Sequence, residues 1–194
     1  MERAWLYMKS EMIFHDLVYE VIMIESEKTI TEKVIDQDIL GTEHANLTYH
    51  CSFEVKEYRL YLRTCEIICA HGYRAVLQAV SKSDIDSNDC TEPYSFELMI
   101  PNVYSGSMVI GRGLVTSDYI VPGNGIPCYG YEEVIELIFS QGVLVTTINH
   151  SRAMKRVRMN LNCGYRTLDK KKDVRCIQKF IRESFVGDYK DQLI

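Results

Sequence analysis

The residues best suited to chemistry by type and spacing in this 194-residue chain are basic side chains near its C-terminal end. One group precedes or occupies an expected strand at residues 157–165, and a second opens an expected helix at residues 169–185. Three successive lysines at a helix N-terminus oppose the helix dipole, at a cost of roughly a few tenths of a kcal/mol each. Because helix stability does not favour lysines there, we predict a partner-binding surface made of Arg152, Lys155, Arg156, Arg158, Lys170, Lys171, Lys172 and Arg175.

The distribution of charge along the chain favours an anionic partner for this surface. Residues 150–194 contain 12 Lys and Arg against 5 Asp and Glu, a balance of +7. Residues 1–149 contain the other 10 basic and 22 acidic residues, a balance of −12, so the net charge of the chain is −5. A chain with this polarity can meet an anionic surface with one end. The alternative interpretation is that the cations form an ordinary solvated helix face.

Cysteine and histidine residues provide a second candidate chemistry. The chain has seven cysteines, an odd number without dense spacing, which indicates free thiols in a reducing compartment. Cys65, Cys69 and His71 follow a C-x3-C-x-H spacing, but a structural zinc site needs four ligands and no second pair stands nearby. We therefore expect the cysteines to be small buried hydrophobes, and we expect no metal and no cofactor. The alternative is a small enzyme whose cysteine nucleophile pairs with His50, His71 or His150.

Two short motifs match ligand-binding sites only in part. Residues 84–89, DIDSND, begin like a calcium loop, but Asp89 occupies the position that requires glycine. Residues 111–113, GRG, begin like a dinucleotide fingerprint, but Thr116 occupies the position of the third glycine. These departures favour a solvated acidic loop and glycines within a strand. We therefore expect a protein without enzymatic activity.

The elements that would position these side chains begin with two long strands. Residues 12–25 are rich in β-branched and aromatic side chains, which is typical of a central strand. Residues 47–63 also predict one strand, but apolar side chains occupy odd positions in its first half and even positions in its second half. We expect a β-bulge near residues 56–57, because one extra residue reverses the facing of a strand. The alternative is a short hairpin, which the absence of Gly, Asn and Asp at this point disfavours.

The remaining pattern alternates between strand and helix periodicity. Apolar positions three and four apart predict helices at residues 64–80, 131–139 and 169–185. Period-two or short apolar runs predict strands at residues 94–100, 142–149 and 157–165, with one or two more within 103–121. Together these elements predict a single α+β domain over residues 1–194, built as a bent, mostly antiparallel sheet with about three packed helices.

The stretch FEVKEYRLYLRTCEIICAHGYRAVLQAV, residues 53–80, resembles the opening of the globular domain of rhabdovirus matrix proteins. In both, an expected strand containing F-x-V-K runs through Arg-Thr into an expected helix. Some rhabdoviruses also have accessory proteins related to their matrix proteins. This chain lacks a basic, proline-rich N-terminal arm and a P-P-x-Y motif, which favours an accessory relative. The resemblance implies a viral accessory or matrix-like protein that binds other proteins and performs no chemistry.

The hydrophobic pattern also bears on location and partners. The first 16 residues contain no uninterrupted apolar core of the kind found in a signal peptide. No run approaches the ~18 apolar residues of a membrane-spanning helix. We expect an intracellular protein, in the cytoplasm or the nucleus of a host cell. We expect its partner to be a host or viral protein, with RNA or an anionic membrane surface as alternatives.

Overall fold

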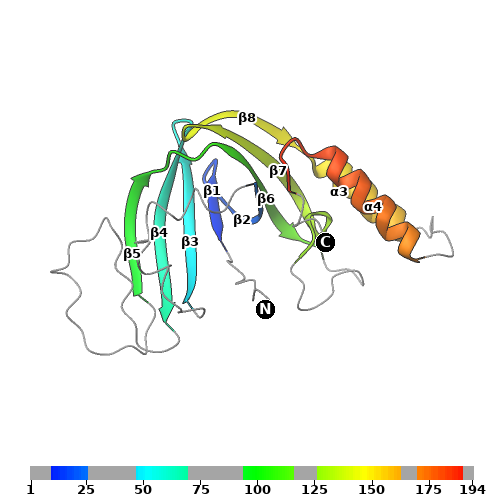
Figure 1. Cartoon of the computed structure of the whole chain (residues 1–194), viewed down its shortest axis with the longest axis horizontal. Helices are drawn as coiled ribbons and strands as arrows, with labels where there is room; N and C mark the ends of the chain where they lie inside the picture. Colours follow the sequence, from blue (N-terminus) through cyan, green and yellow to red (C-terminus); the bar gives the residue numbers. More distant parts are fainter. Residues whose placement is uncertain (1–9, 26–46, 70–93, 116–125, 163–169, 190–194) are drawn as a thin grey trace.

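A computed structural model describes residues 10–25, 47–69, 94–115, 126–162 and 170–189. The strands in these ranges are β1 (Glu11–Phe14), β2 (Leu17–Ile24), β3 (Leu47–Lys56), β4 (Arg59–Cys69), β5 (Tyr94–Pro101), β6 (Gly106–Leu114), β7 (Tyr131–Ser140) and β8 (Val143–Asn149). The other described elements are a 3₁₀ turn, η2 (Cys128–Gly130), and two α-helices, α3 (Ser151–Asn162) and α4 (Lys170–Ser184). The strands form an arch, and both helices lie at one end of it (Figure 1).

The eight strands form one sheet in the order β3-β1-β2-β6-β7-β8-β4-β5. Its strand pairs are antiparallel except for the parallel pair of β1 and β3. One further pairing, that of β3 with β4, bends the sheet back on itself. The step from β8 to β4 in the strand order consists of a single residue pair, Val143 with Arg59. The protein is therefore mostly sheet. The prediction of about three helices is wrong, since the described residues contain two, and only the broad α+β class holds.

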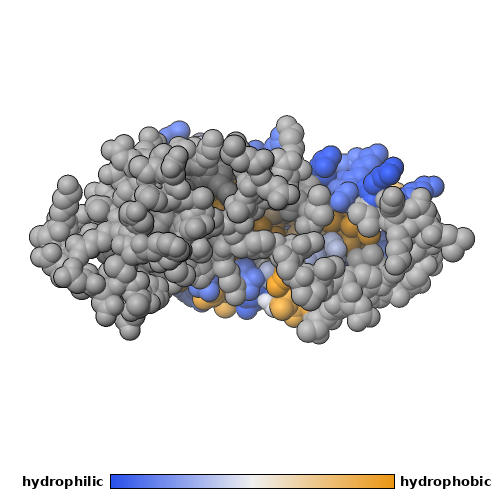
Figure 2. All heavy atoms as spheres, turned by 60° about the horizontal axis from the view of Figure 1, so that its bottom comes forward, coloured by the Kyte–Doolittle hydropathy of each residue, from blue (hydrophilic) through white to orange (hydrophobic). Residues whose placement is uncertain are grey.

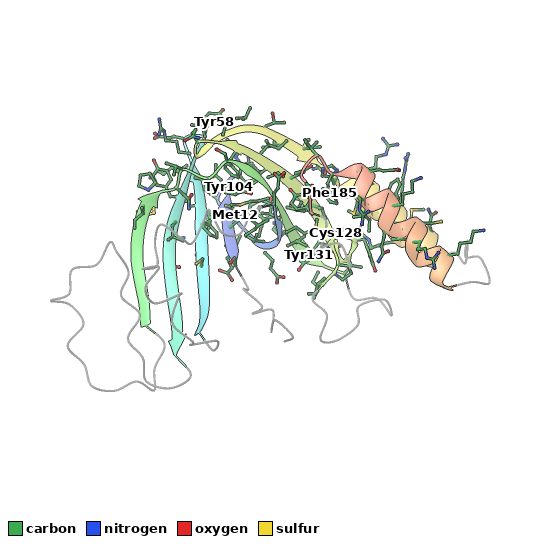
Figure 3. The ribbon with its side chains drawn as sticks, viewed as in Figure 1. Met12, Tyr58, Tyr104, Cys128, Tyr131 and Phe185 are labelled. Carbon is green, nitrogen blue, oxygen red and sulfur yellow. The ribbon has the colours of Figure 1, made fainter. Side chains whose placement is uncertain are left out.

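Two hydrophobic clusters cover opposite faces of this arch. The first contains Met12 and Tyr104, which lie beneath the arch in Figure 3. The second joins the outer face of β6 and β7 to the helices through Met154 of α3, Ile181 of α4 and Phe185. Full burial of one such side chain contributes about 1.5–3 kcal/mol. The second cluster therefore fixes both helices on the sheet.

The strand expected at residues 47–63 is in fact the hairpin of β3 and β4, so the expected bulge is wrong. Glu57 and Tyr58 form a two-residue turn with φ of 51° and 60°, the left-handed values that a type I′ turn requires. Across this turn Val55 pairs with Leu60, and directly paired residues point to the same face of a sheet. The buried face therefore passes from odd to even residue numbers without any bulge at the turn.

The strand expected at residues 12–25 is likewise the hairpin of β1 and β2. His15 and Asp16 have φ of 51° and 61°, so this turn uses the same left-handed geometry. Gln141 and Gly142 join β7 to β8 in the same way, with φ of 50° and 76°. Only the last of these turns contains the glycine that sequence rules look for.

The helix expected at residues 64–80 is wrong in its first part, because β4 continues to Cys69; residues 70–93 lie outside the described part of the chain. Within β4, Cys65 pairs with Cys51 of β3 and with Phe96 of β5. Hydrogen bonding of β4 to a strand on each side stabilises the extended backbone, although the spacing of its apolar residues favours a helix. The rhabdovirus resemblance depends on a strand followed by a helix, but the structure has strand as far as residue 69 where that helix was expected.

Two expected elements are of the wrong type. The helix expected at residues 131–139 is a strand, and the strand expected at residues 157–165 is a helix as far as residue 162. Residues 131–139 lie in β7, whose Val134, Ile135 and Leu137 are all buried because the strand is covered on both faces. This double burial removes the alternation by which a strand is recognised. Residues 157–162 lie in α3, where buried Met154 and Val157 are three apart, and residues 163–165 are outside the described part.

The other expected elements agree with the structure. Strands are confirmed at 94–100 and 142–149, as β5 and β8, and the 103–121 region contains β6. The helix expected at 169–185 is confirmed as α4.

Candidate functional site

Helix α3 presents three of the predicted cations to solvent. The helix starts directly after β8, where the Asn149 side chain accepts a hydrogen bond from the Ser151 amide at 2.9 Å. The Ser151 hydroxyl accepts in turn from the Val134 amide of β7 at 3.0 Å, which ties the helix start to the sheet. Buried Met154 and Val157 then define the inner side of α3. Its outer side exposes the side chains of Arg152, Lys155 and Arg156.

Arg158 has a different role from the one predicted for it. Its side chain is only partly exposed, and its guanidinium donates hydrogen bonds to the backbone carbonyls of Tyr129 and Tyr131. Burial lowers the pKa of this guanidinium, against an opposing effect of the nearby Glu132 carboxylate. Arg158 therefore joins α3 to η2 and to the first residue of β7, and it does not belong to the exposed cations.

Helix α4 presents a longer row of cations than the sequence predicted. Lys172 and Arg175 are exposed, as are Lys179 and Arg182, which the predicted site omitted. These four residues are spaced by three, four and three, so they lie on one side of the helix. Ile181 is buried on the opposite side. The helical spacing alone was sufficient to find Lys179 and Arg182.

The two rows together make what we call the basic surface. It consists of the exposed side chains of Arg152, Lys155, Arg156, Lys172, Arg175, Lys179 and Arg182. The side chains of Lys170 and Lys171, also predicted for the site, lie outside the described part, although their backbone opens α4. Hydrophilic residues gather in Figure 2 at the end of the molecule where Figure 1 places the helices.

Few of these charges are neutralised locally. Lys179 pairs with Glu183 one turn later, at 3.7 Å and with both side chains mostly exposed. Among the residues that the structure describes, no ion pair is made by Arg152, Lys155, Arg156, Arg175 or Arg182. Like charges held at such density repel one another. An anionic partner would relieve this repulsion.

A buried carboxylate anchors the ends of both helices. Glu136 of β7 is fully buried, and its Oε2 lies 2.9 Å from Nε2 of His150, the residue immediately before α3. Its Oε1 accepts hydrogen bonds from the Gly187 amide at 2.8 Å and the Val186 amide at 3.0 Å, just after α4. The Tyr189 hydroxyl donates to the same oxygen at 3.2 Å. Sequence reasoning missed this group, since a glutamate in an apolar run has no local signal of burial.

Ionisation of Glu136 follows from these contacts. Burial by itself would raise its pKa, but hydrogen bonds from His150 and from the Gly187 and Val186 amides outweigh burial. The pKa of the Glu136 carboxyl is therefore lowered, and the group is a carboxylate at neutral pH.

The segment after α4 also packs closely on β6. The Asp188 amide donates to Glu25 Oε1 at 3.2 Å, and Glu25 Oε2 accepts from the Ser107 amide and hydroxyl, both at 2.9 Å. A Cβ atom on Gly187 would lie 1.8 Å from Ser107 Oγ, so a side chain at this position would force Ser107 or Tyr189 to shift. Glycine permits this backbone approach.

Among the described thiols, Cys128 is a poor candidate for the nucleophile of the cysteine alternative. Cys128 is buried 3.6 Å from the Met154 sulfur, and burial raises the pKa of its thiol to about 12. A thiol with that pKa is protonated at neutral pH and is a poor nucleophile. The His150 ring contacts Phe185, with 4.4 Å between ring centres, in addition to Glu136. The side chains of His50 and His71 lie outside the described part.

Neither helix of the described part has the length and apolar content needed to cross a membrane. The chain matches no family model, no curated protein and no solved structure.

Proposed function

We propose that this protein is a non-enzymatic interaction protein that binds an acidic face of a partner protein through the basic surface. The observation that supports the proposal is the row of exposed cations on each helix, five of which make no ion pair within the described residues. The packed sheet holds the helices in place, so a partner need not order them. Binding to a preorganised surface avoids much of the entropic cost of association.

Exposed apolar side chains among the cations favour a protein partner. Met159 of α3 is 54% exposed and follows Lys155 by four residues, so both lie on the same side of the helix. Phe180 of α4 is 43% exposed beside Lys179. Apolar side chains within a charged rim are typical of protein–protein contacts.

The same geometry disfavours the two alternatives. An amphipathic helix that lies in a membrane surface inserts its apolar side into the lipid. In α3 and α4 that side is already used, because Met154, Val157 and Ile181 are packed against the sheet or its cluster. Binding of single-stranded RNA without sequence preference relies on several aromatic stacking partners, and Phe180 is the one exposed aromatic side chain among the described residues of the two helices.

The setting of this function belongs to the proposal as well. An accessory or matrix-like role inside a host cell, with a host or viral protein as partner, rests on the sequence likeness of residues 53–80 alone, since the structure has strand and not helix after Thr64 as far as Cys69. The free cysteines are compatible with a reducing compartment. Affinity capture from cells, with identification of the bound proteins by mass spectrometry, tests this setting.

Charge reversal on each helix tests the binding itself. We expect R152E/K155E/R156E, and separately K172E/R175E/K179E, to weaken binding of poly-L-glutamate while the fold is kept. Exposed ion pairs contribute about 0.2–1 kcal/mol each, so three lost pairs correspond to between about a threefold and a hundredfold loss of affinity. Fluorescence anisotropy of a labelled probe measures the affinity.

Control variants and probes make this result specific. The triple change K56E/R59E/R63E alters the charge equally on exposed side chains of the β3–β4 hairpin, and it should leave the affinity unchanged. Polyuridylate and phosphatidylserine vesicles serve as competing probes. Tighter binding of either one than of poly-L-glutamate, or equal losses in the hairpin control, would contradict the proposal.

A further inference from the structure

We propose that Glu136 is the positioning residue of the basic surface, because one buried carboxylate joins the end of each helix to the sheet. This inference rests on the proposed function. Glu136 touches no partner itself. It acts on the surface through His150, which precedes α3, and through Val186 and Gly187, which follow α4.

The connection is local to the two helices. The His150 carbonyl accepts the Met154 amide at 3.0 Å, which is the first turn of α3, and its ring packs on Phe185 after α4. Phe185 in turn meets Tyr189 edge-on, with 6.0 Å between ring centres. The four donors of Glu136 therefore hold the start of one helix next to the end of the other.

Helix α4 should depend on this anchor more than α3 does. Helix α3 has further polar links to the sheet and to the segment before β7, through Ser151 and through Arg158. In the described residues 175–189, the hydrogen bonds to the sheet come after the last residue of α4, at Glu136 and at Glu25. Removal of the Glu136 carboxylate should therefore displace the α4 cations first and leave the α3 cations in place.

The groups that face Glu136 keep it ionised, and therefore hydrogen-bonded to both helix ends, at neutral pH. Beside it are His150 from the β8–α3 junction and Tyr189 from the C-terminal segment, while Glu25 faces the adjoining Asp188 amide. The ionised carboxylate accepts a hydrogen bond from each of its partners. A protonated carboxyl would instead point its own donor at one of these donors. Because the pKa of Glu136 is lowered, the anchor should fail only in acid.

Hydrogen exchange tests the anchor directly. In E136A, we expect the Val186 and Gly187 amides to exchange at least about tenfold faster than in the wild type, while the amides of Val109 and Ile110 in β6 stay protected. E136Q keeps one acceptor oxygen and should give an intermediate rate. Y189F removes only the hydroxyl donor and should give a smaller change in the same direction, so the test survives if E136A fails to fold.

Binding of poly-L-glutamate tests whether the anchor positions the surface. We expect E136A to weaken binding about three- to tenfold. We further expect K172E/R175E/K179E to weaken binding less in the E136A background than in the wild type, whereas R152E/K155E/R156E keeps its full effect. This coupling is the result that a general loss of stability would not produce. E132A, at the exposed Glu132 of the same strand, carries the same replacement and should leave the exchange of the Val186 and Gly187 amides unchanged.

The outcomes separate this inference from the proposed function. Unchanged exchange at Val186 and Gly187, or equal effects of the α4 reversal in both backgrounds, overturns the positioning role. Failure of the wild type to bind poly-L-glutamate overturns the proposed function, and with it the role of Glu136 in binding. The exchange rates then still report whether the anchor itself exists.

Discussion

At the scale of single residues, burial and backbone contact determine what each polar side chain does. Arg158 and Arg156 are two positions apart on one helix, yet the first is bound to backbone carbonyls and the second is exposed. Glu136 is fully buried, whereas Glu132 on the same strand is exposed. Residue type alone therefore does not identify the members of a binding surface.

Gly187 shows how strictly one position can be constrained. We expect Gly187→Ala to destabilise the protein by about 1–3 kcal/mol, because the added Cβ would lie 1.8 Å from Ser107 Oγ and 2.7 Å from a ring carbon of Tyr189. Urea denaturation followed by circular dichroism measures the change. V186A, at a side chain that is 67% exposed, is the neighbouring control and should be nearly neutral. Equal midpoints for G187A and the wild type would show that the segment yields.

At the scale of elements, turn geometry sets the register of the sheet. The β1–β2 and β3–β4 hairpins place four non-glycine residues at positive φ, His15, Asp16, Glu57 and Tyr58. Such backbone angles are unfavourable for residues with a Cβ. The pairing of the strands on either side must hold these turns in place. Pairing of β3 with β1 and of β4 with β5 provides that support.

The β3–β4 turn should therefore accept a better turn sequence. We expect the double change E57N/Y58G to stabilise the protein by about 1 kcal/mol, since Asn-Gly is the preferred pair in a type I′ turn. Tyr58 is 74% exposed, so little packing is lost with its ring. The urea midpoint measures the gain. A lower midpoint would mean that the Tyr58 ring contributes contacts that outweigh the relief of backbone strain.

At the scale of the whole molecule, the sheet supports the helices and the helices present the charge. The basic surface lies at one end of the arch, on the outer side of the cluster that joins β6 and β7 to α3 and α4 (Figure 1). The residues that fix this arrangement are Glu136, Glu25 and the apolar cluster, none of which lies in the basic surface. Changes within the basic surface should therefore alter binding without loss of stability, whereas a change at Glu136 should alter both.

The acid response of the molecule follows from Glu136. Its pKa is lowered in the folded state, so its contribution to stability is complete above the ordinary glutamate range and is lost as the pH falls through the folded pKa. We expect Glu136 to change the urea midpoint little between pH 7 and pH 5. At pH values below about 4.5, we expect the urea midpoint to decrease as Glu136 becomes protonated. E136Q should show a smaller fall in the same acid range. An identical pH dependence in both proteins would contradict the assignment.

Local pattern by itself predicted β5, β8, α4 and the positive charge of the C-terminal region. These features depend on the spacing and charge of neighbouring residues, which can be read from the sequence. Residue spacing could not identify β7, because both faces of that strand are covered by parts of the chain distant in sequence. It also could not identify the turn at Glu57 and Tyr58, because strand pairing holds their backbone at unfavourable angles.

The sequence therefore determined which residues are charged, and the tertiary structure determined which of those charges face solvent and what holds them there. The physical reason is that exposure and anchoring depend on contacts between distant segments, such as Glu136 with His150 and with the Gly187 amide.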